Sequence, residues 1–176
     1  MTATERGVDR LNALPRAGAV AELRQCCGSR AWAETMADAR PFADAAALLD
    51  TADAVWRVLA REDWLEAFRA HPRIGERARP HAFARGSLEQ RDPGWSEQEQ
   101  ARVRTAGAGA LAELAALNRL YEERFGHIFL ICATGLGADE ILAALRRRLA
   151  SDPETELHSA AEEQRKITRL RLERLL

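Results

Sequence analysis

Lysine is nearly absent from this sequence. Lys166 is the only lysine among 26 basic Lys and Arg residues. An enzyme that forms a Schiff base with its substrate or with pyridoxal phosphate needs a lysine amine in its site. Lys166 would have to serve alone, and the apolar spacing of the last predicted helix, at 153–175, places it on a solvent-facing side. A P-loop is excluded as well, because the sequence contains no Gly-Lys-Ser/Thr.

Cysteine is also scarce. The chain has three cysteines, Cys26, Cys27 and Cys132. Their number is odd, two of them are adjacent, and no Cys-x-x-Cys occurs. This usage favours reduced thiols rather than a disulfide framework or a zinc ribbon, and it predicts a cytoplasmic protein.

Long apolar runs and a strong net charge are missing too. No run is long enough to span a bilayer, and no signal-peptide pattern opens the chain. The net charge is −1, so nothing points to nucleic acid or to an anionic membrane as a partner. With 176 residues, 30% charged and 47% hydrophobic, the composition predicts one soluble domain over residues 1–176.

The sequence contains no set of alternating strand patterns, and helical spacing dominates. The fold class predicted is all-α: a single-domain bundle of about seven to nine helices with a long irregular loop at 72–95. The stretch FGHIFLIC at 125–132 fits either a buried extended segment or a buried helix. Helices are predicted at 8–14, 17–26, 30–37, 44–59, 62–70, 96–124, 138–149 and 153–175.

The last of these helices places polar residues on an apolar face. A helix advances about 100° per residue, so Gln164 and Arg171 fall near the centre of its hydrophobic stripe. A buried arginine is unfavourable unless it is paired, and its planar fork suits a carboxylate or an amide. Arg171 is therefore either a ligand-binding residue or a structural arginine. In the second case it pairs with a core glutamate or extends past the stripe to water.

The helix predicted at 96–124 raises the same conflict. Its apolar face, projected back to the first turn, takes in Ser96, Glu99 and Gln100. Ser-x-x-Glu is also the capping box, in which Ser96 begins the helix and Glu99 reaches back to it. The cap alone explains neither Gln100 nor an inward-facing helix end, where free N–H groups could bind an anion. Both interpretations stay open.

His71 precedes Pro72, and the residue before a proline avoids the helical region. His71 is thus a natural helix terminus whose ring could cap the last carbonyls. It could equally be held there for chemistry. A metal site formed by His71, Glu76 and His81 matches no standard ligand spacing, so no metal is expected. His127 lies in an apolar stretch and is predicted to be a core histidine.

Four motifs in the chain resemble those of one known enzyme family. AHPRIGE at 70–76, SEQEQ at 96–100, NRLYEERFGHIFLICATG at 118–135 and EEQRKITRLRLERLL at 162–176 follow one another in the order of the OHCU decarboxylase family. The resemblance runs from about residue 8 to the C-terminus. Those enzymes convert 2-oxo-4-hydroxy-4-carboxy-5-ureidoimidazoline (OHCU) to (S)-allantoin in urate breakdown. The resemblance implies an all-α protein that uses no cofactor, binds a small-molecule substrate and forms a homodimer.

The same resemblance implies roles for individual residues. The catalytic residues would be His71, in the His-Pro motif, and Glu99, in the Ser-x-x-Glu-Gln motif. The residues implied to contact the substrate are Pro72, Ser96, Glu97, Gln98, Gln100, Phe129, Leu130, Ile131, Cys132, Ala133 and Arg171.

Two alternatives remain beside this function. Many family members carry a basic residue where this chain has Thr134, Gly135 and Leu136. A related decarboxylase for another heterocyclic or ureido acid is therefore the first alternative. The second is a helical binding module without catalytic activity, which would tolerate the loss of His71 and Glu99.

Overall fold

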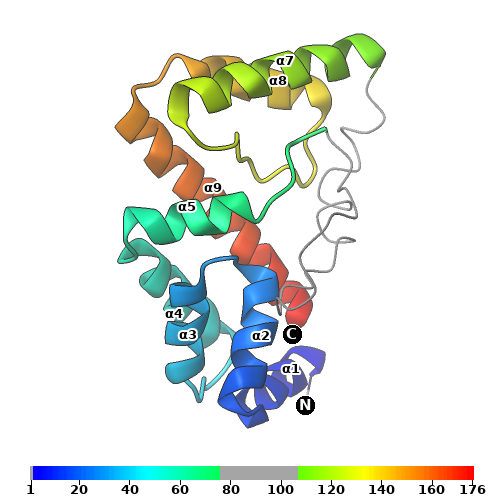
Figure 1. The fold of residues 1–176 in the computed structure, drawn as a ribbon. Helices are drawn as coiled ribbons and strands as arrows, with labels where there is room; N and C mark the ends of the chain where they lie inside the picture. The colour runs from blue at the N-terminus through cyan, green and yellow to red at the C-terminus, as the bar shows by residue number, and fades with distance from the viewer. Residues whose placement is uncertain (1, 76–106) are drawn as a thin grey trace, which may run out of the picture. The chain divides into compact units, whose positions relative to one another are not determined.

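A computed structural model describes residues 2–75 and 107–176 of the chain. This described part contains eight helices and no strand, which confirms the all-α prediction (Figure 1). Of the loop predicted at 72–95, only residues 72–75 belong to the described part of the chain. None of its helices is long and apolar enough to cross a membrane. The helices are α1 (Ala3–Ala13), α2 (Arg16–Cys26), α3 (Arg30–Asp38), α4 (Ala45–Arg57), α5 (Arg61–Arg69), α7 (Ala108–Phe125), α8 (Ala138–Leu149) and α9 (Pro153–Leu175).

The helix boundaries follow local capping chemistry. α1 begins earlier than the sequence pattern predicts, because Thr2 and Glu5 form a capping box. The Thr2 hydroxyl accepts a 3.1 Å hydrogen bond from the backbone N–H of Glu5. α9 begins at Pro153 after Asp152, whose carboxylate accepts a 3.0 Å bond from the N–H of Thr155. The Thr155 hydroxyl and this backbone bond lower the pKa of Asp152.

The long helix predicted at 96–124 is wrong at Gly107. α7 begins only at Ala108, and Gly107 has an extended backbone with ψ 155°. Glycine disfavours a helix interior by about 1 kcal/mol relative to alanine, and Gly107 and Gly109 stand close together here. The face of α7 therefore cannot be projected back through Gly107 to Ser96. The candidacy of Glu99 and Gln100 now rests on the family resemblance.

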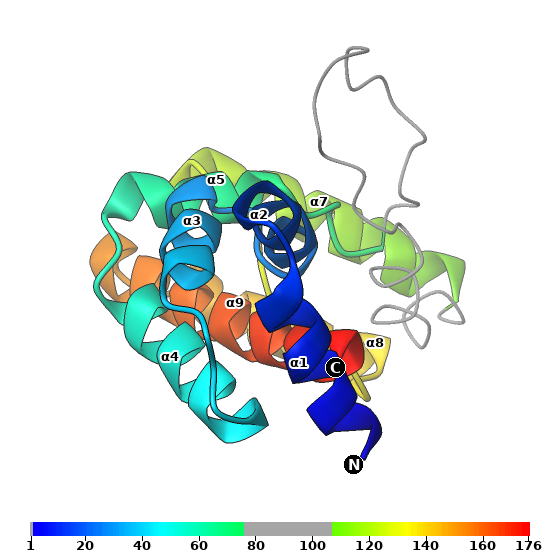
Figure 2. The same ribbon diagram turned by 90° about the horizontal axis from the view of Figure 1, so that it is seen from below.

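The described residues fall into two compact units, each considered by itself. The first unit holds residues 2–67 and 165–176. In it α2 packs on α3, α3 on α4, and α1 on α4 (Figure 2). Its interior includes fully buried side chains from several of these helices: Leu11, Leu23, Trp32, Met36 and Leu48.

Arg40 ties two helix ends together in the first unit. Its guanidinium donates 2.7 Å hydrogen bonds to the carbonyl oxygens of Leu11 and Leu14, at the end of α1. It also donates a 2.9 Å bond to the carbonyl oxygen of Ala37, in α3. Carbonyls at helix C-termini have no partner within their own helix, and a basic side chain satisfies them.

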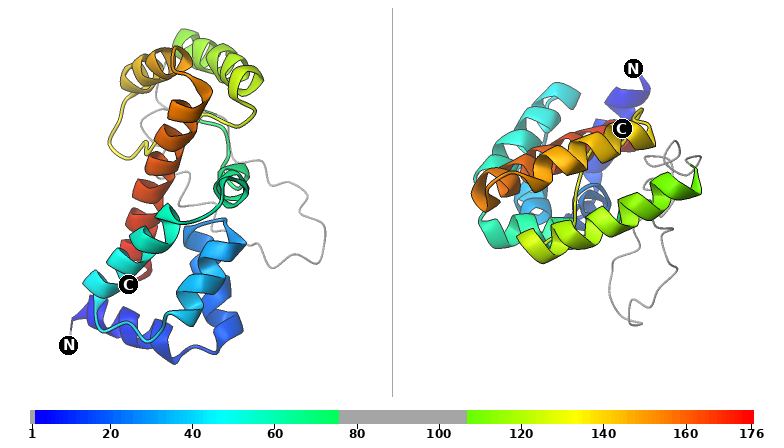
Figure 3. Two further views of the ribbon diagram at one scale, coloured as in Figure 1. Left: turned by 90° about the vertical axis from the view of Figure 1, so that its left-hand side faces the viewer. Right: turned by 90° about the horizontal axis from the view of Figure 1, so that it is seen from above.

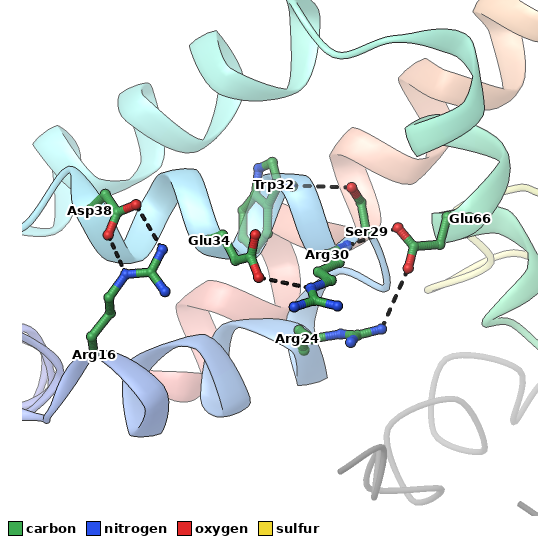
Figure 4. A network of polar contacts seen from close by, with 8 residues as sticks. All are labelled: Arg16, Arg24, Ser29, Arg30, Trp32, Glu34, Asp38 and Glu66. Carbon is green, nitrogen blue, oxygen red and sulfur yellow. Dashed lines mark hydrogen bonds and ion pairs between the residues drawn. The ribbon is translucent and has the colours of Figure 1, made fainter. Parts of the chain in front are cut away.

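Polar contacts join α2, α3 and α5 on the surface of this unit (Figure 4). Arg16 holds Asp38 through bonds of 2.6 and 2.8 Å, and the hydrogen bond lowers the pKa of the Asp38 carboxyl. The carboxylate of Glu66 accepts a 2.9 Å bond from the N–H of Arg30 and lies 3.6 Å from Arg24. Ion pairs at or near the surface, such as these, typically add little to stability.

The second unit holds residues 68–75 and 107–164. In it α7 and α8 lie side by side (Figures 1 and 3). One hydrophobic cluster fills its interior, made of Ile74, Leu114, Tyr121, Phe129, Ala133, Ile141, Leu142, Ala144 and Leu145. Leu114 and Tyr121 are buried and Ala110, Leu117 and Phe125 are packed against the cluster, so these residues of α7 share one face at helical spacing. The segment after α5, the segment after α7 and helices α7 and α8 therefore share one core.

Candidate functional site

His71 follows the end of α5. That helix ends at Arg69, and the backbone N–H of His71 donates a 3.0 Å bond to the carbonyl oxygen of Phe68. The stop predicted at His-Pro is confirmed within the usual margin for helix ends. The ring nitrogen Nε2 of His71 is shielded from solvent. His71 therefore sits at a helix end in the second unit, with Pro72 directly after it.

The residues after Pro72 are fastened to α7. Arg73 forms a two-point ion pair with Glu122, with distances of 2.5 and 2.8 Å. The buried side chain of Asn118 donates a 3.1 Å hydrogen bond to the carbonyl oxygen of Ile74. Gly75 then adopts a left-handed conformation with φ 84°. These contacts fix the chain just beyond His71, and Arg73 has a structural role in them.

The segment after α7 carries the predicted substrate contacts from Phe129 to Ala133. α7 ends at Phe125, and the next residue, Gly126, has a φ of 73°, the left-handed conformation typical of a helix terminus. Of the two alternatives for FGHIFLIC, a helix is excluded, because residues 126–133 have no regular secondary structure. Phe129, Leu130 and Ala133 are buried, whereas Ile131 and Cys132 are half-buried.

His127 is a core histidine, as predicted. Its ring lies in an aromatic group, with centroids 5.4 Å from Phe68 and 5.5 Å from Tyr121. Its Nδ1 atom is 3.0 Å from the carbonyl oxygen of Ile128. Phe68 precedes His71 by three residues, so His127 joins the His71 region to the segment at 129–133. The structure thus brings two of the predicted site segments into one unit.

Two charged side chains hold the backbone of the 129–133 segment. Arg148 of α8 donates a 2.7 Å hydrogen bond to the carbonyl oxygen of Leu130, and its guanidinium lies 4.8 Å from the centre of the Phe129 ring. Glu163 of α9 accepts a 2.8 Å bond from the N–H of Cys132. The segment is therefore anchored to both helices.

Arg148 is itself held by a buried acidic partner. Its Nε atom donates a 2.8 Å bond to Glu156, whose side chain is 0% exposed. The same carboxylate oxygen accepts a short hydrogen bond from the hydroxyl of Tyr121. Burial is the main cause that raises the pKa of Tyr121 well above its usual range, and the neighbouring carboxylate adds to it. The phenol therefore stays protonated and acts as a hydrogen-bond donor.

Arg171 lies on α9 in the first unit and is 2% exposed. Gln164, on the second unit's side of the division, is fully buried. The sequence pattern predicted both polar side chains to face inward, and their burial confirms this. The role of Arg171 as a ligand remains a proposal.

The predicted site residues between α5 and α7 lie outside the described part of the chain. They are Ser96, Glu97, Gln98, Glu99 and Gln100. Glu76 and His81 lie outside it as well. Within residues 2–75 and 107–176, no group of three or more His, Cys, Asp or Glu side chains is arranged to hold a metal ion.

The sequence reasoning missed several polar residues of the second unit. Asn118 is buried between Leu114 and Tyr121, at helical spacings of four and three residues. Its helical spacing from these two apolar residues could have identified it from the sequence. Arg148 follows Leu145 by three residues on the apolar face of α8 and carried the same signal. No such signal pointed to Glu163, which binds a backbone N–H.

Comparison with known protein families places the chain in one of them. The sequence model described as OHCU decarboxylase matches residues 12–173. The chain belongs to the OHCU decarboxylase family. This match confirms the resemblance carried by the four sequence motifs.

Named relatives support the assignment. The chain is 42% identical over 157 residues to the uric acid degradation bifunctional protein TTL of Arabidopsis thaliana, covering 88% of this chain and 46% of that protein. It is 39% identical over 108 residues to the 2-oxo-4-hydroxy-4-carboxy-5-ureidoimidazoline decarboxylase of Amia calva, covering 61% of this chain and 58% of that protein. The chain thus spans about half the length of these two relatives. A decarboxylase of the same name from Haloferax volcanii is 31% identical, with 80% of this chain and 77% of that protein covered.

Solved structures agree with the family. A crystal structure of OHCU decarboxylase in the presence of (S)-allantoin has a TM-score of 0.72 and 38% sequence identity, covering 88% of this chain and 96% of that one. A crystal structure of (S)-allantoin synthase has a TM-score of 0.69 at 20% identity, covering 96% of this chain and 54% of that one. The second likeness concerns the fold alone.

Proposed function

We propose that this chain catalyses the decarboxylation of OHCU to (S)-allantoin, as a carboxy-lyase that uses no cofactor in urate degradation. The observation that carries the proposal is family membership over residues 12–173. The Haloferax volcanii relative, which is matched over most of its length, is named as the decarboxylase of this compound. The related crystal structure was determined in the presence of (S)-allantoin, the product of the proposed reaction.

The chemistry constrains what the protein must supply. Loss of CO₂ releases an electron pair at the hydroxyl-bearing ring carbon, and this pair shifts into the adjacent C=N system. A proton must then be added at the neighbouring, ureido-bearing carbon, and the hydroxyl group loses its proton to become the carbonyl of allantoin. The conjugated C=N and carbonyl groups of the imidazoline ring can hold that electron pair. The protein then has to orient the substrate, exclude water and deliver one proton to one face of the ring.

His71 is the residue we assign to proton transfer. A histidine titrates near neutral pH, which suits a general acid or base. Two observations support this role. The Nε2 atom of His71 is shielded from solvent, and the contacts of Arg73 and Ile74 with α7 fix the backbone next to the imidazole of His71. Delivery from one fixed imidazole would produce a single enantiomer.

The other roles follow the family motifs. Glu99 would orient or polarise the substrate and share in proton transfer. Arg171 would bind a carboxylate or carbonyl edge through its two-pronged guanidinium. The remaining residues would contact the ureido and ring groups: Pro72, Ser96, Glu97, Gln98, Gln100, Phe129, Leu130, Ile131, Cys132 and Ala133.

The test of the reaction is the consumption of freshly generated OHCU by the purified protein. We expect OHCU to disappear faster than in buffer, with release of CO₂. The alternative favoured by Thr134, Gly135 and Leu136 is a decarboxylase for another heterocyclic or ureido acid. Faster turnover of such an acid, with OHCU decaying at the buffer rate, would replace the present proposal with that alternative.

The test of the residue roles uses His71→Ala and Glu99→Ala. Both variants are expected to stay folded and to lose enzymatic formation of (S)-allantoin above the spontaneous racemic background. Glu62→Ala, on the exposed side of α5, is the control and should keep wild-type activity. Full rate and stereoselectivity in both site variants would favour a binding module or different catalytic residues.

The proposal also covers organisation. We propose that the two compact units act as one functional domain over residues 1–176, because the family match from 12 to 173 runs through both. Homodimer formation and a cytoplasmic location are further expectations of the family resemblance and of the cysteine usage. Light scattering coupled to size-exclusion chromatography measures the first, and a mass of one chain would refute it.

A further inference from the structure

Charged side chains form hydrogen bonds with the backbone on both sides of Ile131. Arg148 donates to the carbonyl oxygen of Leu130 at 2.7 Å, and Glu163 accepts from the N–H of Cys132 at 2.8 Å. The two bonds come from different helices, α8 and α9. They engage the peptide groups on either side of one residue in a segment without regular hydrogen bonding. Ile131 and its neighbours are therefore held in a single backbone conformation.

The position of Arg148 is strongly determined. Its guanidinium contacts Glu156 at 2.5 and 2.8 Å, lies 3.5 Å from the Tyr121 hydroxyl and stacks over Phe129 at 4.8 Å. Its side chain is 10% exposed. Removing two charges from water is unfavourable, and apolar residues of similar volume often stabilise a core as well or better. A purely structural explanation of this buried pair is therefore weak, whereas a need for one defined backbone conformation accounts for it.

Glu163 accepts the second of these two backbone hydrogen bonds. A carboxylate that accepts from a backbone N–H forms a charge-assisted bond, about twice as strong as a neutral one. Glu163 is half-buried in the middle of α9, next to exposed Glu162. Its carboxylate reaches the segment from the side of α9, while Arg148 reaches it from α8.

We propose that Arg148 and Glu163 are positioning residues that hold the Leu130–Cys132 backbone in its substrate-binding conformation. The inference rests on the proposed function, in which residues 129–133 contact OHCU. Neither side chain need touch the substrate. They act by preorganisation, because a segment fixed before binding loses less conformational entropy when the substrate arrives.

The primary experiment compares Glu163→Ala with Glu163→Gln, with Glu162→Ala as the matched control. The glutamine retains an oxygen that can accept from Cys132, so it should rescue what alanine loses. We expect amide hydrogen exchange at Cys132 to rise about tenfold or more in the alanine variant, as loss of a charge-assisted bond implies. Exchange in the glutamine and control variants should stay near the wild-type rate, and thermal midpoints of all variants should stay close together.

Kinetics on OHCU measure the functional consequence. We expect Glu163→Ala to raise KM about tenfold with a smaller change in kcat, because the segment binds substrate and does not transfer the proton. Glu163→Gln and Glu162→Ala should keep the wild-type KM. Arg148→Lys keeps a positive charge opposite Glu156 but cannot reach Leu130 with a second prong, so it should show the same rise in KM.

The outcomes separate the inference from the function beneath it. Wild-type turnover combined with unchanged KM and unchanged Cys132 exchange in Glu163→Ala would overturn the positioning role alone. A KM increase that glutamine does not rescue would also overturn it, because the hydrogen bond would not be the cause. A wild-type protein that does not consume OHCU would overturn the proposed function and, with it, the role of these residues in substrate binding.

Discussion

The side-chain amide of Asn118 donates a 3.1 Å hydrogen bond to the carbonyl oxygen of Ile74, three residues after His71. Asn118 is 3% exposed. A buried carbonyl that loses its partner destabilises the folded state by about 1–3 kcal/mol. We expect Asn118→Leu to lower the free energy of unfolding by that amount and to lower kcat on OHCU. Urea denaturation and steady-state kinetics measure the two effects. A variant with wild-type stability and kcat would show that this hydrogen bond does not fix the segment after His71.

Arg73 and Glu122 form a second contact between the segment after His71 and α7, an ion pair that is partly exposed. An ion pair of this kind contributes roughly 0.2–1 kcal/mol and weakens as salt is added. We expect Arg73→Ala and Glu122→Ala to show a small positive coupling in a double-mutant cycle. The exchanged pair, Arg73→Glu with Glu122→Arg, should recover part of the activity lost by Arg73→Glu alone. Strictly additive effects would mean that the pair does not hold the His71 segment.

Gly75 is required for both backbone and packing reasons. Its φ is 84°, and a Cβ atom there would lie 2.9 Å from Cδ2 of Leu114. We expect Gly75→Ala to lower the free energy of unfolding by about 1 kcal/mol or more. Gly109→Ala is the matched control, because Gly109 lies in α7 and a Cβ atom there meets nothing within 4 Å. That substitution should leave stability equal or raise it by up to about 1 kcal/mol. Denaturation that ranks the two variants the other way would refute the geometry at Gly75.

Tyr121 is the only tyrosine in the chain, so tyrosinate absorbance reports on this one group. Its pKa is raised, chiefly by burial. The native state therefore retains a proton that the unfolded state loses above pH of about 10. The stabilisation associated with this group is fully present below that pH and declines as pH rises further.

The measurement is a spectrophotometric titration of native and urea-unfolded protein. We expect the unfolded protein to ionise near pH of about 10 and the native protein to show no tyrosinate until it unfolds. Tyr121→Phe should abolish the signal. A native titration that matches the unfolded one would show that Tyr121 is not buried against Glu156.

The sequence predicts most of the helices because apolar spacing and capping residues are local properties. Gln164 and Arg171 were predicted to face inward by the same argument, and both are buried. The argument failed at Gly107, because glycine has weak helix propensity and α7 begins only at Ala108, although the apolar pattern alone would extend the helix back to residue 96. Spacing describes a helical face only where the helix is unbroken.

The bonds that shape the candidate site were beyond such reasoning. Glu163 binds the N–H of Cys132, and Asn118 binds the carbonyl of Ile74. Backbone groups are the same in every residue, so no sequence pattern identifies which carbonyl or N–H a distant side chain will satisfy. Glu156 is an acidic residue and is nevertheless fully buried, because Arg148 and Tyr121 form hydrogen bonds with it.

The stereochemistry of the product tests the central proposal most directly. Freshly generated OHCU is mixed with the wild-type protein, with His71→Ala or with buffer, and circular dichroism is followed at a wavelength sensitive to allantoin. We predict that the signal of (S)-allantoin develops rapidly with the wild-type protein alone, while His71→Ala and buffer give only slow racemic decay. A wild-type signal that develops no faster than in buffer would contradict the proposal that this chain decarboxylates OHCU.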